Sequence, residues 1–133
     1  MGSVTNQVIG RESVVVSGDV AQVPVRVPWY RSLPLSSVER LTITLDGRQI
    51  DPADTRLLVN GNALTVPELL QRPYEFWFVQ DTARALVPAG DLGATTTATV
   101  TATFRIPYIF VGPDTPMRRE VSETLVLDVE RES

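Results

Sequence analysis

The side chains that enzymes most often use for chemistry are largely missing from this sequence. It contains no histidine, cysteine or lysine, and its twelve basic residues are all arginine. Nucleophilic triads that need histidine or cysteine, Ser-Lys pairs and lysine Schiff bases are therefore excluded. Zinc would have to bind without its usual histidine and cysteine ligands. The sixteen aspartates and glutamates remain as candidates for acid–base chemistry or for binding a hard cation.

The positions of these carboxylates do not indicate a site. Asp51 and Asp54 lie in the segment IDPADT, which is typical of a solvated turn and lacks the run of oxygen ligands of an EF-hand. Glu68 and Glu75 could approach each other across a proline-flanked bend, but the sequence does not establish the separation that a glycosidase needs. We therefore expect no catalytic residue and no metal ligand on this chain.

One loop holds an unusual amount of apolar and aromatic mass. The side chains concerned are Trp29, Tyr30, Arg31, Leu33, Pro34 and Leu35. A surface loop with this composition usually packs beneath something else. We predict that it contacts a partner protein, and its prolines would stiffen it and lower the cost of ordering it on binding. The alternative is a lid that folds back over the chain's own core.

Two further segments contain aromatic side chains. Tyr108 and Phe110 follow a long strand pattern and precede a Gly-Pro turn, so they are either an edge of the core or part of the same partner interface. Phe76, Trp77 and Phe78 are consecutive and cannot all point the same way in a strand. We expect Phe76 and Phe78 in the core and Trp77 on the outer face, where it could contact a partner or a ligand.

The elements that must position these residues are strands. Apolar and polar residues alternate in the ranges 23–27, 41–45, 99–106 and 124–130. This alternation buries one face of each strand and favours antiparallel sheets. Turn signals such as Asp46-Gly47 and Asn60-Gly61 separate the strands.

The pattern as a whole predicts an all-β fold. About eight short strands and a single helical turn, at Pro67–Gln71, favour one antiparallel β-sandwich domain that is immunoglobulin-like in the loose sense. A small barrel is the alternative. The chain of 133 residues has the length of one domain, which we expect to span residues 11–133, with residues 1–10 as a loose N-terminal arm.

Bulk properties limit the partners. The net charge of −4 comes from scattered residues, so no basic patch for nucleic acid is expected. No apolar run approaches the roughly 18 residues of a membrane span, so no membrane is expected either. Because cysteine is absent and the N-terminus lacks the features of a signal peptide, we expect a cytoplasmic protein.

The stretch VPVRVPWYRSLPLSSVERLTITLDGRQI resembles the beta subunit of bacterial C-glycoside deglycosidases. In that family a strand ends in proline and is followed by an aromatic pair, by Tyr-Arg-x-Leu-x-Leu-Ser, and later by a strand that closes on Val-Asp-Gly. Residues 28–36 and 45–47 match this pattern here, with leucine in place of the valine. Residues 74–76 and 105–108 are also similar, so the resemblance extends over about residues 20–129.

The resemblance implies a small β-sandwich subunit that pairs with a TIM-barrel alpha subunit of the sugar-isomerase type. Together they would split the C–C bond between a sugar and an aromatic aglycone such as a flavonoid, in a 3-oxo-C-glycoside made by a separate oxidoreductase. The ketone acidifies the adjacent C–H, so that a base can drive elimination while a metal stabilises the enolate. The base and the divalent metal, expected to be manganese, would belong to the alpha subunit. This chain would then carry no cofactor and would be the accessory subunit of a carbon–carbon lyase.

Two other functions stay open. The chain could be a stand-alone carbohydrate-binding or accessory module, or a structural sandwich that assembles with a different enzyme. A carbohydrate-binding module would present aromatic rings at every second position of one strand. The adjacent Trp29 and Tyr30 do not form such a line, and we identify none elsewhere in the sequence.

Overall fold

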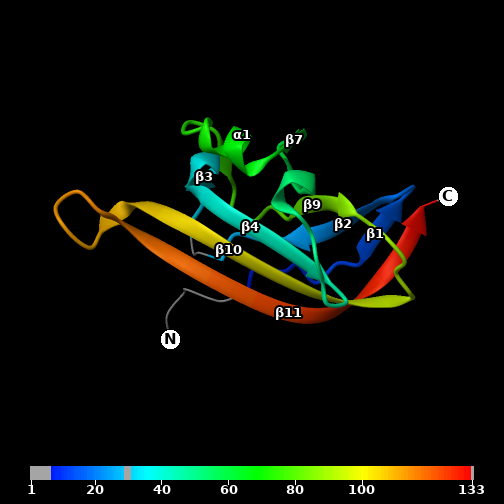
Figure 1. Cartoon of the computed structure of the whole chain (residues 1–133). Coiled ribbons are helices and arrows are strands. Elements are labelled where there is room, and N and C mark those ends of the chain that lie inside the picture. Colours follow the sequence, from blue (N-terminus) through cyan, green and yellow to red (C-terminus); the bar gives the residue numbers. More distant parts are fainter. Residues whose placement is uncertain (1–6, 29–30, 133) are drawn as a thin grey trace.

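The computed structural model describes residues 7–28 and 31–132, apart from the side chain of Tyr108. Within these residues the chain forms eleven strands, one short helix and two 3-10 turns (Figure 1). The strands are β1 (Val14–Ser17), β2 (Val20–Val25), β3 (Leu33–Pro34), β4 (Val38–Leu45), β5 (Arg48–Gln49), β6 (Arg56–Val59), β7 (Asn62–Leu64), β8 (Phe76–Trp77), β9 (Ala83–Pro88), β10 (Thr95–Phe110) and β11 (Pro116–Glu132). The helix is α1 (Val66–Leu70), and the 3-10 turns are η1 (Leu35–Ser37) and η2 (Pro52–Asp54).

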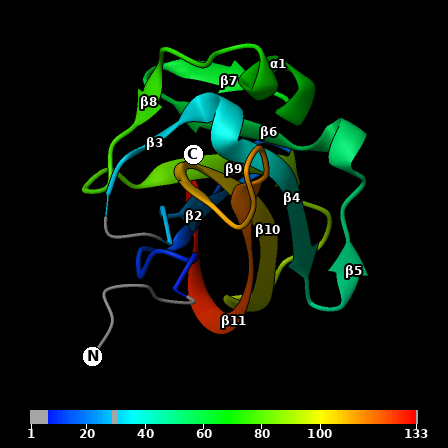
Figure 2. The ribbon, with the colours of Figure 1, turned by 90° about the vertical axis from the view of Figure 1, so that its left-hand side faces the viewer.

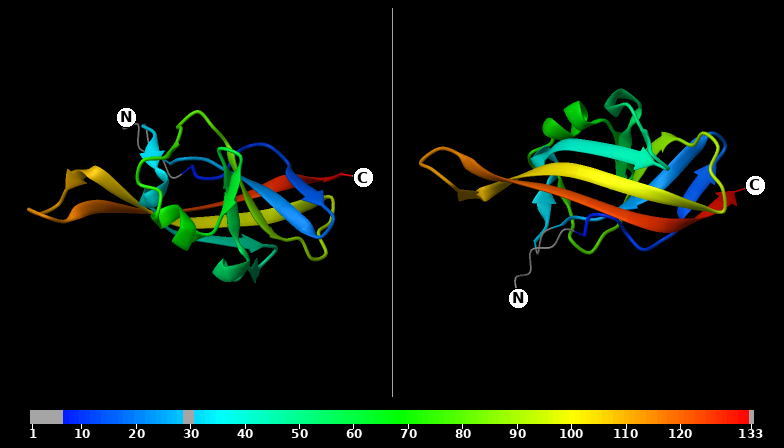
Figure 3. Two further views of the ribbon diagram at one scale, coloured as in Figure 1. Left: turned by 90° about the horizontal axis from the view of Figure 1, so that it is seen from above. Right: turned by 60° about the horizontal axis from the view of Figure 1, so that its bottom comes forward.

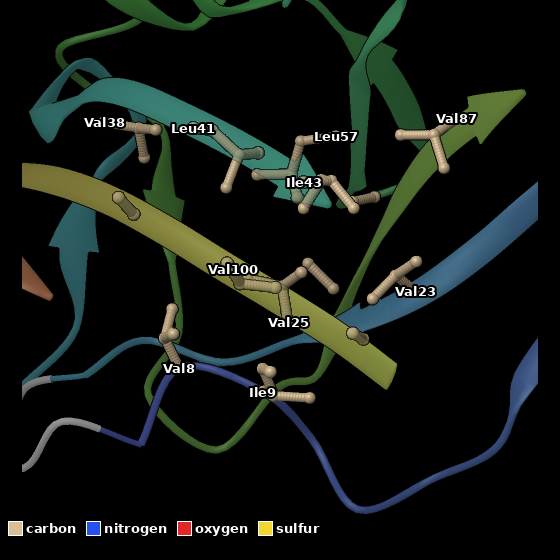
Figure 4. Close-up of a cluster of buried hydrophobic side chains, with 14 of the residues drawn as sticks. Val8, Ile9, Val23, Val25, Val38, Leu41, Ile43, Leu57, Val87 and Val100 are labelled. Carbon is tan, nitrogen blue, oxygen red and sulfur yellow. The ribbon is translucent and has the colours of Figure 1, made fainter. Parts of the chain in front are cut away.

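Nine of the strands form one sheet in the order β5-β4-β10-β11-β1-β2-β9-β6-β7, and β3 pairs with β8 in a separate small sheet. The large sheet folds over, so that side chains of β4 and β10 face those of β2, β9 and β6 across the core (Figure 4). In the described residues β5 and β7 are the two edges, so the sheet does not close into a barrel. The predicted all-β sandwich is confirmed.

One strand pair departs from the expected antiparallel pattern. β1 runs parallel to β11, with Val14 opposite Val129, whereas the other pairings in the described chain are antiparallel. The two strands lie near opposite ends of the chain, and the whole domain connects them. Alternation within each strand reports which face is buried, and it carries no information on this distant pairing.

The core follows the alternation of the strands. In β4, Leu41, Ile43 and Leu45 are buried, while the intervening threonines are partly exposed. Figure 4 shows Ile43 from β4 close to Leu57 from β6, and Val100 from β10 close to Val25 from β2. These positions belong to one continuous cluster of buried side chains, so the described residues share one hydrophobic core.

Residues 7–10 are part of this domain rather than a loose arm. Val8 and Ile9 are fully buried, and the backbone N–H of Arg26 donates to the carbonyl of Val8 at 2.8 Å. The carboxylate of Glu123 accepts hydrogen bonds from the N–H groups of Val8 and Ile9. The predicted boundary at residue 11 is therefore too late, because two apolar side chains near the N-terminus complete the core. Residues 1–6 lie outside the described residues.

The predicted hairpin turns are confirmed by the backbone. Asp46 and Gly47 have φ values of 52° and 83°, and Asn60 and Gly61 have values of 54° and 83°. Positive φ at both central residues matches the twist of the flanking strands, and aspartate, asparagine and glycine adopt it most readily. The two turns join β4 to β5 and β6 to β7.

The last two strands form a hairpin much longer than the rest of the sheet. β10 and β11 are paired from Thr95 and Asp128 to Phe110 and Pro116, whereas β4 accompanies β10 only as far as Phe104. Beyond that point the two strands pair with each other alone and project from the body of the domain (Figures 1 and 3). The end of the molecule that carries this projection also carries β3 (Figure 2).

Candidate partner-binding surface

The loop predicted to contact a partner folds into β3 and η1 at one end of the domain (Figure 2). β3 pairs with β8, so that Leu33 lies opposite Trp77 and Pro34 lies opposite Phe76. Because paired residues of antiparallel strands share a face, this register sorts the side chains into an inner and an outer set. Trp29 and Tyr30 lie outside the described residues.

The inner set covers the chain's own core. Leu33, Leu35 and Trp77 are all fully buried. The ring of Trp77 lies 6.2 Å from that of Phe104, and its indole N–H donates to the carbonyl of Asp81 at 3.1 Å. Leu33 and Leu35 therefore act as a lid, which is the alternative left open by the sequence, and they add nothing to an exposed patch. The role of this loop in partner binding stays a prediction, and among the described residues of the loop it now depends on Arg31, which is exposed, and Pro34, which is partly exposed.

On the outer side Pro34 lies opposite Phe76, and the exposed residues Tyr74 and Phe78 stand two positions before and after Phe76; we call these four residues the aromatic patch. The exposed fractions are 93% for Tyr74, 41% for Phe76 and 46% for Phe78, against 1% for Trp77. The expectation that the two phenylalanines are buried and the tryptophan is exposed is therefore wrong. Three consecutive aromatic residues allow either orientation, and pairing with the buried Leu33 selects the one that places Trp77 inward.

A polar network holds the backbone beneath the aromatic patch. The carboxylate of Glu75 accepts hydrogen bonds from Arg72 at 2.9 Å and from the side-chain amide of Asn60 at 3.1 Å. The same amide donates to the carbonyl of Phe76 at 2.8 Å. The hydrogen bond from Arg72, followed by that from Asn60, lowers the pKa of Glu75 below its ordinary value. These contacts fix β8 against the β6–β7 turn.

The two strands of the small sheet are also connected through their ends. The backbone N–H of Leu35 donates to the carbonyl of Glu75 at 2.8 Å, and that of Val79 donates to the hydroxyl of Ser32 at 2.9 Å. The segments on both sides of the aromatic patch are thus tied to each other. A surface held in this way needs little further ordering when a partner binds.

Three of the carboxylates that sequence analysis considered for chemistry, Asp51, Glu68 and Glu75, have structural partners. Glu68 accepts hydrogen bonds from the backbone N–H and the hydroxyl of Thr65, and the backbone bond is the main reason why the pKa of Glu68 is lowered. This is a capping interaction at the start of α1. Asp51 accepts from the backbone N–H of Ala53 at 2.9 Å, which confirms a turn there. In the described residues no three carboxylates lie close enough together to hold a metal ion.

The tip of the β10–β11 hairpin is the second exposed apolar surface at this end. Phe110 is 54% exposed and Val111 is still more exposed, although the N–H of Val111 is bonded to the carbonyl of Thr115 at 2.9 Å. The tip is therefore an ordered turn that displays apolar side chains. Phe110 is one of the predicted interface residues, and the side chain of Tyr108, another of them, lies outside the described part of the structure.

Comparison with known proteins gives this geometry a context. Residues 10–108 match the family of C-glycoside deglycosidase beta subunits. That match covers most of the chain. The chain belongs to the C-glycoside deglycosidase beta subunit family.

Several curated relatives support the family assignment. The chain is 36% identical over 104 residues to a 3'-dehydrocarminate deglycosidase beta subunit of a Microbacterium species, which covers 77% of this chain and 79% of the relative. It is 35% identical over 112 residues to the C-glycoside deglycosidase beta subunit of Microbacterium trichothecenolyticum, covering 81% and 83%. A C-glycoside deglycosidase beta subunit of Arthrobacter globiformis is 32% identical over 94 residues, covering 68% and 71%. A beta subunit implies a partner subunit.

The aromatic patch is the feature of this family member that sequence reasoning missed. Tyr74, Phe76 and Phe78 stand at every second position, and this spacing was the available signal. The expectation that Trp77 lies on the outer face hid this signal.

None of the helices in residues 7–28 and 31–132 is long and apolar enough to cross a membrane.

Proposed function

We propose that this chain is the non-catalytic beta subunit of a heteromeric lyase that cleaves the C–C glycosidic bond of 3-oxo-C-glycosides. The observation that carries the proposal is the match of residues 10–108 to the C-glycoside deglycosidase beta subunits. One relative is named a 3'-dehydrocarminate deglycosidase beta subunit, and this name supports an oxidised glycoside as the substrate class.

The catalytic groups are assigned to the partner. This chain has no histidine, cysteine or lysine, and the carboxylates Glu68 and Glu75 already bond to other groups of the chain. We assign the base to a TIM-barrel alpha subunit, together with a divalent metal, expected to be manganese. Bound there, the metal would polarise the substrate ketone and stabilise an enolate. The lack of cysteine supports a cytoplasmic location for the complex.

The contribution of this chain is then to complete the environment of the active site. Active sites of TIM barrels lie at the C-terminal face of the barrel, among the loops that follow the strands. A small β-sandwich that docks beside this face would order those loops and exclude water from the reacting atoms. This chain has a continuous hydrophobic core and exposed apolar side chains around β8 and at the hairpin tip, and both suit that role.

The test is a comparison of the separate and combined subunits. Purified chain, purified alpha subunit and their equimolar mixture are incubated with a 3-oxo-C-glycoside, and aglycone release is followed by chromatography. The mixture is expected to release aglycone much faster than either subunit alone, and metal analysis should find the divalent ion with the alpha subunit. Aglycone release by the isolated chain, or a stoichiometric metal in it, would contradict the proposal.

A second candidate is a stand-alone carbohydrate-binding module. The specific observation in its favour is that Tyr74, Phe76 and Phe78, at every second position, are all exposed; this is the spacing that sequence analysis expected of such a module, although only Phe76 lies within a strand. Calorimetric titration of the isolated chain with C-glycosides and oligosaccharides separates the two functions. Binding of free saccharide without any alpha subunit supports the module.

A further inference from the structure

We propose that the aromatic patch is the anchor through which this chain docks onto the alpha subunit. This inference rests on the proposed function, because that function supplies the partner. The inference goes further by naming the surface of this chain that contacts the alpha subunit, and this surface is not the loop that the sequence analysis favoured. The outer face of the β3–β8 sheet makes the contact, and the inner face belongs to the core of this chain.

The exposed area is the first argument. Aromatic side chains bury about 150–250 Å² each when fully covered, so Tyr74, Phe76 and Phe78 together expose roughly 350 Å². A standard protein interface covers about 800 Å² on each partner. Three side chains thus supply nearly half of the area, and the exposed Phe110, the last residue of β10, adds a further contact. The aromatic patch has the size of an interface centre rather than of a scattered surface residue.

The chemistry around the patch is the second argument, and it favours a protein over a sugar. Recognition of a saccharide combines an aromatic platform with polar side chains free to bond hydroxyl groups. The polar side chains beside this patch, Asn60, Arg72 and Glu75, bond to one another and to the backbone of Phe76. These hydrogen bonds hold the backbone beneath the aromatic patch in place. The matching surface on the alpha subunit should therefore be an apolar groove.

Pre-organisation is the third argument. Phe76 sits on a strand whose backbone is bonded to Asn60, and the neighbouring Glu75 is bonded to Leu35 and Arg72. Aromatic anchors held in place before binding lose little conformational freedom, and such residues are enriched among those that dominate binding energy.

The experiment measures the affinity of the alpha subunit encoded in the same genome for variants of this chain. Tyr74→Ser and Phe76→Ser remove patch side chains, and Val126→Ser removes a side chain that is 67% exposed on β11 outside the patch. Surface plasmon resonance should show about a 30-fold rise in Kd for Phe76→Ser and a smaller rise for Tyr74→Ser. Val126→Ser should bind within twofold of wild type. Thermal melting checks folding, and Tyr74→Ser serves if Phe76→Ser is unstable, because Tyr74 makes almost no contacts that could be lost.

Photo-cross-linking tests whether the aromatic patch lies next to the alpha subunit. Together with the affinities, it separates failure of the docking proposal from failure of the proposed function. Benzoylphenylalanine in place of Tyr74 should cross-link to the alpha subunit under ultraviolet light, and the same group in place of Val126 should not. If wild type binds the alpha subunit and supports turnover while the patch variants bind equally well, the proposed function stands and the anchor is overturned. A cross-link from position 74 to a second copy of this chain also overturns it. If wild type does not bind the alpha subunit at all, both proposals fail.

Discussion

Glu123 lies on the inner face of β11, with 14% of its side chain exposed, and it holds the N-terminal segment against the core. One carboxylate oxygen accepts hydrogen bonds from the N–H groups of Val8 at 2.9 Å and Ile9 at 2.8 Å, and the other lies 3.5 Å from Arg11. The Arg11 contact is long and exposed and contributes little. The two backbone bonds matter more, because Val8 and Ile9 are buried and have few alternative partners.

We predict that Glu123→Ala lowers the free energy of unfolding by about 1–3 kcal/mol, because it leaves buried N–H groups without an acceptor. Glu123→Gln should lose less, since an amide oxygen can still accept. Urea denaturation measures both. Glu120→Ala is the matched control, because Glu120 is exposed on the same strand, and it should change stability by less than about 0.5 kcal/mol. Equal effects of Glu123→Ala and Glu120→Ala would show that the N-terminal segment packs without this carboxylate.

A second residue-scale prediction concerns Gly90 in the loop between β9 and β10. Its φ of +60° is unfavourable for any residue with a Cβ, and a Cβ would lie 2.8 Å from Nη2 of Arg48. That nitrogen donates to the carbonyls of Pro88 and Ala89. Gly90→Ala should therefore lower the free energy of unfolding by about 1–2 kcal/mol. Gly93→Ala is the control in thermal melting, because its Cβ would meet its nearest atom at 3.8 Å.

At the scale of elements, the small β3–β8 sheet should respond to pH through Glu75. Its folded-state pKa is lowered, so its contribution to stability is present above the unfolded-state pKa and is lost as the pH falls through the folded-state value. Glu75→Gln should therefore melt at a lower temperature than wild type at pH 7. The difference should shrink as the pH falls below the ordinary glutamate pKa of about 4.3, where the unfolded chain takes up the proton, and through the lower folded-state pKa of Glu75. A difference that is constant from pH 7 to pH 3 would rule out the charge as its cause.

The projecting hairpin gives a prediction of its own. Phe110→Ser should leave the melting temperature unchanged within error. The side chain of Phe110 is half exposed, and it lies beyond Phe104, where the pairing of β10 with β4 ends. The Phe110→Ser substitution should still weaken binding of the alpha subunit, because we expect the hairpin tip to contact that subunit. Binding measured beside Val126→Ser separates this effect from a general loss of surface hydrophobicity. Wild-type affinity for Phe110→Ser would restrict the interface to the aromatic patch.

The elements also show what the sequence could and could not predict. The alternation in β4 and β10, the two Gly-containing turns and the helical turn at α1 depend on neighbouring residues, and all were predictable. The orientation of Phe76, Trp77 and Phe78 was not, since local alternation allows both choices and Leu33, more than forty positions away, selects one. The parallel pairing of β1 with β11 depends on distant residues in the same way.

For the candidate site, the sequence singled out the loop that folds into β3 and η1, but it did not separate the core-facing side chains of that loop from the exposed ones. Leu33 and Leu35 are apolar because they cover the core. Composition alone cannot distinguish an apolar residue that covers the core from one that binds a partner. The exposed Phe76 lies on β8, the strand that pairs with that loop, and the exposed Phe78 follows this strand. A surface assembled from two distant segments becomes visible only when their register is known.

At the scale of the whole molecule, the domain is asymmetric. β3, β8 and the hairpin between β10 and β11 lie at one end of the molecule (Figure 2). Tyr74, two residues before β8, and Phe110, the last residue of β10, are both exposed. The outer face of β10 and β11 is instead rich in hydroxyl groups, with Thr99 bonded to Thr124 at 2.8 Å and Thr101 to Ser122 at 3.0 Å. Val20, Leu70 and Val126 are exposed elsewhere in the described residues, but the exposed aromatic side chains belong to the segments around β8 and to the hairpin tip, where one partner could cover them.

This asymmetry predicts the footprint of the alpha subunit on the chain. Hydrogen–deuterium exchange with and without excess alpha subunit should show slower exchange in residues 72–80 and in the hairpin tip at 109–115. The loop at 89–94, which joins β9 to β10, should exchange equally in both samples, because it lies at the opposite end of β10 from the tip. The amides of central strands are protected by the sheet in both states and serve as internal references. Slower exchange confined to residues 89–94 would place the interface at the other end of the domain and would leave the aromatic patch without a partner.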